Sequence, residues 1–410
     1  MPVTMSAVGL DSAAVDLMDL SLFVDSREDE VFDQLRRTAP VHWNAPSDRG
    51  PGFWALTRYA DVKQAAGDHE RLSSASGTQI MDRKVEGRLA SLHNMDDPEH
   101  AQLRKVTVPH LRAVKVRQWD EVIGSSVATL LDEAEERGRF DLVDVVSARL
   151  PMLVLSQVMG VPAADAVRMV DWTNRLTSSD PDHAVDERAL AEAREEVMGY
   201  FQRLTEERRA RPAADLVSIL ANGAVDGRPL SWEQLAAYYI VLVAAGNETT
   251  RHLVSGGTLA LHRTPGAWDR VVRDESLLAP AVEEMFRYVS PVACMRRTAL
   301  VDHEIGGREV RAGEKVVLWF SAANRDPAVF ADPQQFRVDR TPNEHLTFGW
   351  GIHFCLGAHL ARAEVRAFYG ELRRRGLRLD VVGEPRRVRH NLFRGWTSLH
   401  VEVASARVRG

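Results

Sequence analysis

The chain has 410 residues, of which 45% are apolar and 27% are charged, as in an ordinary globular protein. Its 52 Lys and Arg residues stand against 58 Asp and Glu residues, so the net charge is −6 and gives no electrostatic reason to expect nucleic-acid binding. Two cysteines, Cys294 and Cys355, exclude a disulfide framework and the multi-cysteine zinc and iron–sulfur patterns.

The sequence also lacks the usual signs of export and membrane insertion. The first twenty residues carry no basic stretch followed by an apolar run, which a secretion signal would have. The longest apolar run, residues 235–246, is too short to span a bilayer. Sparse cysteine use fits a reducing compartment. We therefore expect a soluble cytoplasmic protein with no membrane anchor and no nucleic-acid partner.

The predicted elements at the N-terminal end are short. Residues 1–40 look like an irregular N-terminal segment with short helical pieces. Two apolar and aromatic runs, residues 41–43 and 53–57, flank a turn-rich stretch and predict a strand–turn–strand unit. Residues 59–66 predict a short helix, and the small polar residues 73–78 predict a loop.

Helical spacing dominates from about residue 101 to residue 289. The longest predicted helix, residues 232–262, follows Ser231, a favourable N-cap residue. The other helices predicted in this part cover 118–136, 143–159, 187–209 and 281–288. Further along, the pattern predicts a helix over 358–374 and strands at 303–310, 315–320 and within 377–403. We expect a mainly α fold with a smaller β portion (α+β), in which residues 1–410 form a single domain.

A single cysteine lies in the most informative stretch, residues 348–358, which reads F-G-W-G-I-H-F-C-L-G-A. Glycines permit backbone turns that other residues resist, and the helix predicted next offers unpaired amide donors at its start. Both features favour the thiolate form of Cys355. Such a thiolate could act as a nucleophile, as a metal ligand or as neither, and an isolated free cysteine is most often a buried core residue.

The spacing F-G-x-G-x-H-x-C-x-G resembles the haem-ligand loop of the cytochrome P450 family, and further motifs resemble that family in the same order along the chain. The resemblance implies a cytochrome P450 fold with haem b between the long helix and the cysteine loop with the helix after it. It implies that Cys355 supplies the axial thiolate to the iron. Other residues implied to bind the haem are Phe348, Gly349, His353, Gly357, Ala245, Gly246, Thr249 and Arg297.

A histidine and an arginine in the stretch D-P-E-H-A-Q-L-R resemble the family's residues at the haem edge. His100 and Arg104 are four residues apart, so they share one helix face. By charge, the pair suits the haem propionates, although the spacing alone also describes an ordinary surface pair.

The long helix contains the stretch A-G-N-E-T-T, in which Glu248 and Thr249 match the family's acid–alcohol pair. A carboxylic acid and a hydroxyl at this place can relay protons during oxygen activation. Gly246 and the β-branched threonines weaken a regular helix and predict a local groove. Without the resemblance, the stretch would be only a polar cluster on a helix.

Three residues are implied to have a structural role. Glu284 and Arg287 match a buried charge pair of the family, and Arg340 is our choice for the later arginine that joins them. The Glu-x-x-Arg spacing is uninformative alone, because Glu206 and Arg209 reproduce it.

The resemblance implies a monooxygenase that inserts one oxygen atom from O2 into a C–H bond of a steroid, terpenoid, lipid or secondary metabolite. The alternatives are a hydroxylase of a carrier-protein-bound amino acid or other intermediate, a peroxide-driven hydroxylase, and a haem sensor without turnover. By the same resemblance, the substrate pocket is lined by Ile80, Leu92, Ala244, Ala245, Val292, Ala293, Leu392 and Phe393.

The chain contains no flavin or iron–sulfur domain, so we expect electrons from a ferredoxin and its reductase. Basic residues after the haem-edge helix and after the cysteine loop form a candidate docking patch for an acidic ferredoxin, or else ordinary solvated helix faces. These residues are Arg112, Lys115, Arg117, Arg362 and Arg366.

Overall fold

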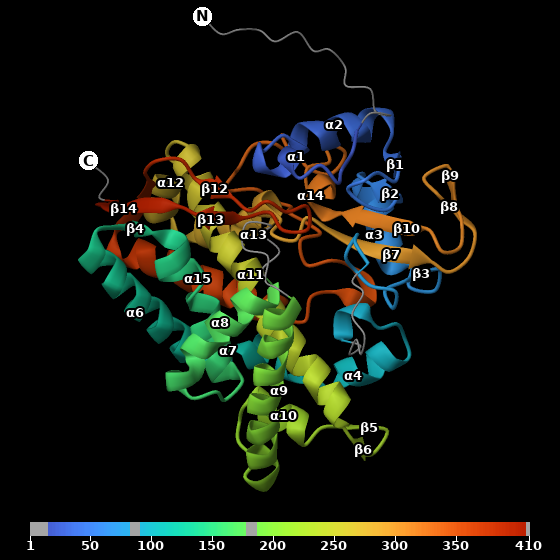
Figure 1. The fold of residues 1–410 in the computed structure, drawn as a ribbon. Coiled ribbons are helices and arrows are strands. Elements are labelled where there is room, and N and C mark those ends of the chain that lie inside the picture. Colours follow the sequence, from blue (N-terminus) through green and yellow to red (C-terminus); the bar gives the residue numbers. More distant parts are fainter. Residues whose placement is uncertain (1–14, 83–90, 178–186, 407–410) are drawn as a thin grey trace, which may run out of the picture.

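The computed structural model describes residues 15–82, 91–177 and 187–406. Most of the helices gather on one side of the molecule, and the largest sheet lies on the other side beside the N-terminal helices (Figure 1). The helices are α1 Ser21–Val24, α2 Glu28–Thr38, α3 Tyr59–Gly67, α4 Glu99–Thr107, α5 Ala113–Val116, α6 Asp120–Arg137, α7 Leu150–Val158, α8 Ala166–Thr177, α9 Glu187–Ala210, α10 Leu216–Ala221, α11 Trp232–Arg263, α12 Ala267–Arg273, α13 Leu278–Val289, α14 Phe320–Ala323 and α15 Ala358–Arg375.

The strands are short and form one larger sheet and several small ones. In the larger sheet the order is β1-β2-β10-β7-β3, and a three-stranded sheet has the order β11-β14-β4. The predicted α+β class is thereby confirmed. The strands are β1 Val41–Asn44, β2 Phe53–Leu56, β3 Leu72–Ser73, β4 Arg139–Asp141, β5 Ala224–Val225, β6 Arg228–Pro229, β7 Cys294–Ala299, β8 His303–Ile305, β9 Arg308–Val310, β10 Lys315–Trp319, β11 Leu377–Val381, β12 Arg386–Arg387, β13 Trp396–Ser398 and β14 His400–Ser405.

Helix α11 is the central element of the helical side. Ser231 caps its N-terminus by accepting a hydrogen bond from the Gln234 amide, while the Gln234 side chain accepts one from the Ser231 amide. The helix packs against α7, α8, α13 and α15. At Gly256 a Cβ atom would lie within 3 Å of the side chains of Trp396 and Val289, so glycine is what permits this close approach.

Strand β7 was not predicted from the sequence. It pairs antiparallel with β10, with Val316 opposite Arg297 and Leu318 opposite Met295. Two adjacent arginines, Arg296 and Arg297, obscure the strand pattern, although both are buried. Burial of Arg296 is possible because its guanidinium group donates to the carbonyls of residues 76 and 77 and to Asp82. Strand β3 also takes in Ser73, at the start of the predicted loop 73–78.

Two further predictions of secondary structure need correction. The helix predicted over 143–159 is broken: a π-helical turn covers Val143–Ser147, and α7 begins at Leu150 with Pro151, which has no N–H to continue the earlier turn. In the N-terminal segment, α2 is a regular helix of 11 residues rather than an irregular piece. Residues 1–14 of that segment lie outside the described residues.

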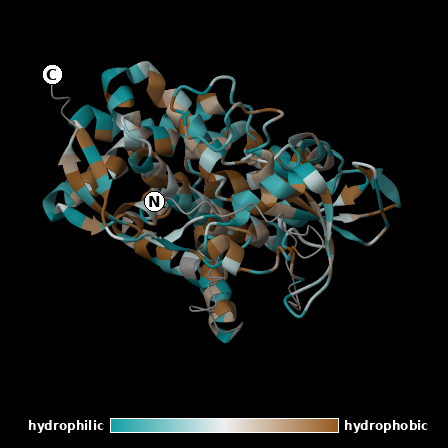
Figure 2. Cartoon of the chain, turned by 90° about the horizontal axis from the view of Figure 1, so that it is seen from above, coloured by the Kyte–Doolittle hydropathy of each residue, from teal (hydrophilic) through white to brown (hydrophobic). Residues whose placement is uncertain are grey.

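Apolar side chains fill the space between these elements. Hydrophobic stretches occur mainly toward the middle of the molecule and hydrophilic ones at its periphery (Figure 2). The largest core cluster joins α6, α7, α11, α13 and α15, and a second one holds α1 and α2 against Trp319 of β10. Among the helices described, none is long and apolar enough to cross a membrane.

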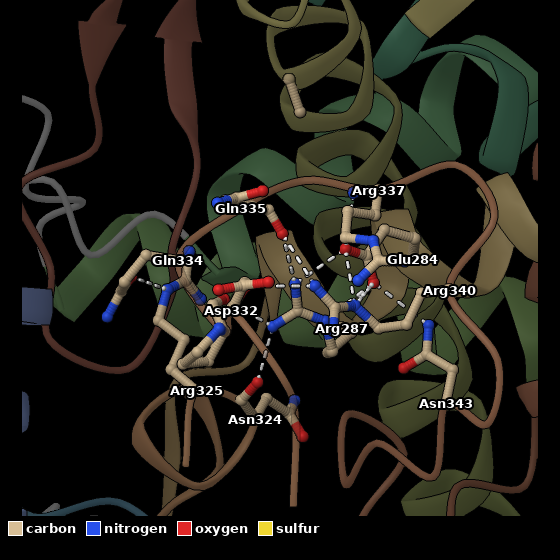
Figure 3. Close-up of polar contacts among 12 residues, drawn as sticks. Glu284, Arg287, Asn324, Arg325, Asp332, Gln334, Gln335, Arg337, Arg340 and Asn343 are labelled. Atoms are coloured by element: carbon tan, nitrogen blue, oxygen red, sulfur yellow. Dashed lines mark hydrogen bonds and ion pairs between the residues drawn. The ribbon is translucent and has the colours of Figure 1, made fainter. Parts of the chain in front are cut away.

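A buried ion network joins α13 to the long irregular segment that precedes residue 348 (Figure 3). Glu284 accepts two hydrogen bonds from Arg287, at 2.7 and 2.8 Å, and two from Arg340, both at 3.0 Å. Its remaining donors are the Arg337 amide and the Asn343 side chain. Glu284 and Arg287 are fully buried. The structure therefore brings the three residues assigned to this network together, and Arg287 also donates to the carbonyls of Asn324, Pro333 and Gln335.

We predict that Glu284→Gln lowers the free energy of unfolding by about 3–5 kcal/mol, because it leaves buried arginine charge without its carboxylate. Urea unfolding followed by circular dichroism measures this loss. Glu304→Gln, on the exposed hairpin strand β8, is the control and is expected to change the free energy by less than about 0.5 kcal/mol. Equal stabilities of the two variants would show that the network contributes no more than a surface residue.

Candidate functional site

A large apolar cavity lies between α11 and the segment that leads into α15. Its volume is about 320 Å³. Ala245, Gly246 and Thr249 of α11 form part of one wall, and Phe348 and Cys355 form part of the opposite wall. A mainly apolar cavity with a few convergent polar groups is the usual form of a cofactor or small-molecule site.

The cysteine loop is folded tightly by its glycines and its backbone hydrogen bonds. Gly349 and Gly351 adopt the left-handed conformation, with φ of 72° and 73°. A Cβ atom on Gly351 would lie 2.8 Å from the Ala66 carbonyl oxygen, so the loop lies directly against α3. The Cys355 amide donates to the Phe348 carbonyl at 2.8 Å. These contacts fix Cys355 at the cavity wall, just ahead of α15.

Cys355 is exposed, and it lines the cavity. Burial raises the pKa of its thiol, against the opposing effects of the Gly357 amide and the guanidinium groups of Arg104 and Arg362. The expectation that loop and helix start would favour the thiolate is therefore wrong for the protein alone, because desolvation outweighs them. Coordination to a metal ion deprotonates a thiol outright, so the position suits a metal ligand.

Four side chains that can carry positive charge meet at one edge of the cavity. The rings of His100 and His353 lie 4.4 Å apart, and Arg104, Arg297 and His353 line the cavity. Burial lowers the pKa of Arg297 to about 10, and burial with the Arg297 charge lowers that of His353 to about 3. The Nε2 atom of His100 is buried without a hydrogen-bond partner among the described residues.

Nδ1 of His100 lies 3.3 Å from Asp97, but neither Arg104 nor Arg297 forms an ion pair with a carboxylate among the described residues. Arg297 donates only to the Arg296 carbonyl in the hydrogen bonds of the described residues, and Arg104 donates to the Phe354 carbonyl. An anionic ligand with two carboxylates would satisfy the guanidinium groups and the unpartnered histidine nitrogen together. The residues present therefore fit a haem whose propionates this edge would bind and whose iron Cys355 would ligate.

On the α11 wall, the structure separates the two members of the expected acid–alcohol pair. The Thr249 hydroxyl donates to the Ala245 carbonyl at 3.2 Å and lines the cavity. The Glu248 carboxylate does not line it and instead lies 2.9 Å from Nε2 of His252 and 3.3 Å from Arg251. We did not single out His252 from the sequence. Its fully buried ring fills the space where a side chain on Gly395 would be, so any Cβ there would collide with it.

Sequence reasoning also missed an acidic residue on the cavity wall. Glu364 of α15 is buried, and burial raises its pKa to about 8 against the effect of a hydrogen bond with Thr250. It is therefore largely protonated at neutral pH. Glu364 lies one helical turn after Leu360, another lining residue, and this four-residue spacing is the signal that could have found it.

The predicted substrate pocket agrees with the cavity only in part. Leu92, Ala245 and Val292 line it, and so do the cofactor residues Phe348, Gly349 and Gly357. Ile80, Ala293 and Leu392 lie instead in the core cluster around Trp319, and Ala244 and Phe393 are not on the cavity wall. Lining residues that the sequence did not indicate include Val241, Leu242 and Met295. Parts of the expected pocket region, residues 83–90 and 178–185, lie outside the described residues.

Comparison with known proteins gives a consistent result. The family model described as cytochrome P450 matches residues 51–375. The chain is 34% identical to linalool 8-monooxygenase of Pseudomonas putida over 94% of its length and 98% of that protein. It is 38% identical to a methyl-branched lipid omega-hydroxylase of Mycobacterium bovis, over 94% of this chain and 93% of that one.

A solved structure extends the similarity to the fold. The cytochrome P450 of Mycobacterium marinum in complex with pseudoionone superimposes with a TM-score of 0.88 at 33% identity, covering 97% of this chain and all of that one. The chain belongs to the cytochrome P450 family of haem-binding monooxygenases.

Proposed function

We propose that this cytoplasmic monooxygenase hydroxylates a C–H bond of a branched or cyclic apolar molecule of terpenoid, steroid or methyl-branched lipid type, with electrons from a ferredoxin and its reductase. The observation that carries the proposal is the apolar wall of the cavity, in which Leu92, Leu242, Val292 and Met295 line the same space as Thr249. Such a wall binds hydrocarbon by removing it from water and rejects unpaired polar groups. The named substrates of the relatives support the same class.

In this proposal, haem supplies the oxygen chemistry when it is bound, and the chain positions it and controls protons. Cys355 would hold the iron, and His100, Arg104, Arg297 and His353 would hold the propionates. Thr249 presents its hydroxyl to the cavity, and Glu248, the adjacent residue, is the proposed source of protons for it.

Titration of substrates into the ferric protein, with the absorption spectrum as readout, tests the substrate class. Terpenes, steroids and branched fatty acids are expected to shift the spin state and to yield hydroxylated products. Val292→Phe is expected to weaken binding of a bulky member about tenfold, because overpacking costs on the order of 1–3 kcal/mol. Val301→Phe, at an exposed position, is the control. A response only to carrier-protein-bound substrates would favour the alternative function.

We predict that Thr249→Ala uncouples electron use from product formation, because it removes the hydroxyl that faces the cavity. Product formed per NADPH is expected to fall by about tenfold or more while released peroxide rises. Thr264→Ala is a matched control, since the Thr264 hydroxyl also donates to the carbonyl four residues earlier on α11, at 2.9 Å. Efficient turnover with added peroxide but none with ferredoxin and O2 would instead support a peroxide-driven enzyme.

The candidate docking patch is supported in part by the surface beside the cysteine loop. Arg112, Lys115, Arg117 and Arg366 are exposed and have no ion-pair partner among the described residues. Arg362 does not fit this role, because Glu283 accepts two hydrogen bonds from it. The proposed ferredoxin surface therefore consists of Arg112, Lys115, Arg117 and Arg366, without Arg362.

We predict that the charge reversals Arg112→Glu and Lys115→Glu, combined, slow ferredoxin-dependent reduction by about tenfold at low salt and flatten its salt dependence. Stopped-flow reduction at several ionic strengths measures both effects. Arg308→Glu, on the exposed strand β9, is the control for net charge. If the control slows reduction as much as the double variant, the docking surface lies elsewhere.

A further inference from the structure

A compact charge cluster lies next to Phe348, one of the residues that line the cavity. Glu283 of α13 accepts hydrogen bonds from Nε and Nη2 of Arg362 of α15, at 2.7 and 2.9 Å. The same carboxylate lies 3.2 Å from Nε2 of His345. His345 is buried, and its ring packs near those of Phe286 and Phe348. The cluster thus joins two helices to the start of the cysteine loop.

The charge states of the cluster follow from its contacts. Burial alone would raise the pKa of Glu283, but hydrogen bonds from His345 and Arg362 lower it to about 2, so the carboxylate is ionised. Burial lowers the pKa of His345, which keeps the imidazole neutral. Its Nδ1 accepts from the Thr347 amide, so its Nε2–H donates to Glu283. The cluster therefore holds one negative and one positive charge.

The positive member of the pair lies nearest to the cysteine loop. The guanidinium carbon of Arg362 lies 4.3 Å from the centroid of the Phe348 ring. Phe348 lines the cavity, and its carbonyl accepts the hydrogen bond from the Cys355 amide. The Arg362 guanidinium thus packs on the residue whose backbone holds Cys355, and its charge acts on Cys355 by opposing the effect of burial on the pKa of the thiol. Because the guanidinium group of Arg362 donates two hydrogen bonds to Glu283, its position beside Phe348 is fixed.

We propose that the Glu283–Arg362 pair sets the reduction potential of the haem held by Cys355, with His345 as a positioning residue for the Glu283 carboxylate. The inference rests on the proposed ligation by Cys355. It gives Arg362 a role that differs from docking and gives Glu283 and His345 a role beyond packing. In the wild-type protein, the effect of the Arg362 guanidinium on the reduction potential would be partly offset by the opposite charge of the Glu283 carboxylate.

The two charges have opposite expected effects. Reduction from the ferric to the ferrous state adds one electron from an external reductant, and a positive charge nearby favours it. Glu283→Gln leaves Arg362 uncompensated, so the potential is expected to rise. Arg362→Gln leaves Glu283 uncompensated, so the potential is expected to fall. At a fixed applied potential, the ferrous-to-ferric ratio should change several-fold in opposite directions.

Spectroelectrochemical titration of the purified holoenzyme without substrate measures these potentials. The double variant Glu283→Gln with Arg362→Gln is expected to return near the wild-type value, and Arg362→Lys, which retains the charge, to lie close to wild type. His345→Phe is expected to shift the potential in the same direction as Arg362→Gln, because the carboxylate loses the histidine hydrogen bond and its negative charge is less compensated. A loss of packing alone would not produce shifts of opposite sign.

Glu371 and Arg375 provide a matched control, since they form an ion pair on the same helix, farther from the cysteine loop, at 2.8 Å. Glu371→Gln and Arg375→Gln are expected to leave the potential unchanged. The carbon monoxide spectrum of each reduced protein is recorded first. A wild-type spectrum without the red-shifted thiolate band would overturn the ligation by Cys355 and this inference with it. A normal spectrum with equal potentials in all variants would overturn the charge-pair inference alone.

Discussion

The ion pairs and hydrogen bonds of the Glu284 carboxylate are the interactions on which the position of the cysteine loop depends. Residues 324–347 form few regular elements, so their position cannot come from a backbone ladder of their own. They are held because Glu284 and Arg287 of α13 bind this segment through Arg340, Asn343 and several carbonyls. Since the segment leads directly into residue 348, the network also fixes where the cysteine loop begins. A single buried charge therefore determines the position of one wall of the cavity.

The features that the sequence predicted well are those with a local signal. Glycines that need a left-handed backbone, Gly349 and Gly351, mark the cysteine loop, and Ser231 marks the start of α11. Both are encoded within a few residues. The resemblance to a family added the arginine at position 340, which no spacing rule supplies, and the structure brings it to Glu284.

Features that depend on distant contacts were missed or misplaced. Strand β7 carries two buried arginines, and the partners of one of them, Arg296, lie more than two hundred residues away, so the strand's own pattern is not that of a strand. The assignment of Ile80 and Leu392 to the pocket failed because α1 and α2 cover them in a separate core. The local features around Cys355 favour a thiolate, yet burial, which only the fold determines, dominates its pKa. The residues near Cys355 in the sequence were therefore enough to locate the site, whereas the pKa of its thiol depends on burial by the folded chain.

Two glycines join the cavity wall to the C-terminal part of the chain. The Trp396 side chain packs against α11 at Gly256. The His252 ring of α11 packs against the C-terminal loop at Gly395, so a side chain from each element fills the space beside a glycine of the other. Each of these positions restricts which residues the other can hold. A side chain larger than hydrogen at 395 is compatible only with a smaller residue at 252, and the same holds for 256 and 396. Substitutions at these positions of α11 are therefore expected to be epistatic with substitutions in the C-terminal loop, so the order in which they are introduced decides whether the intermediate variants fold.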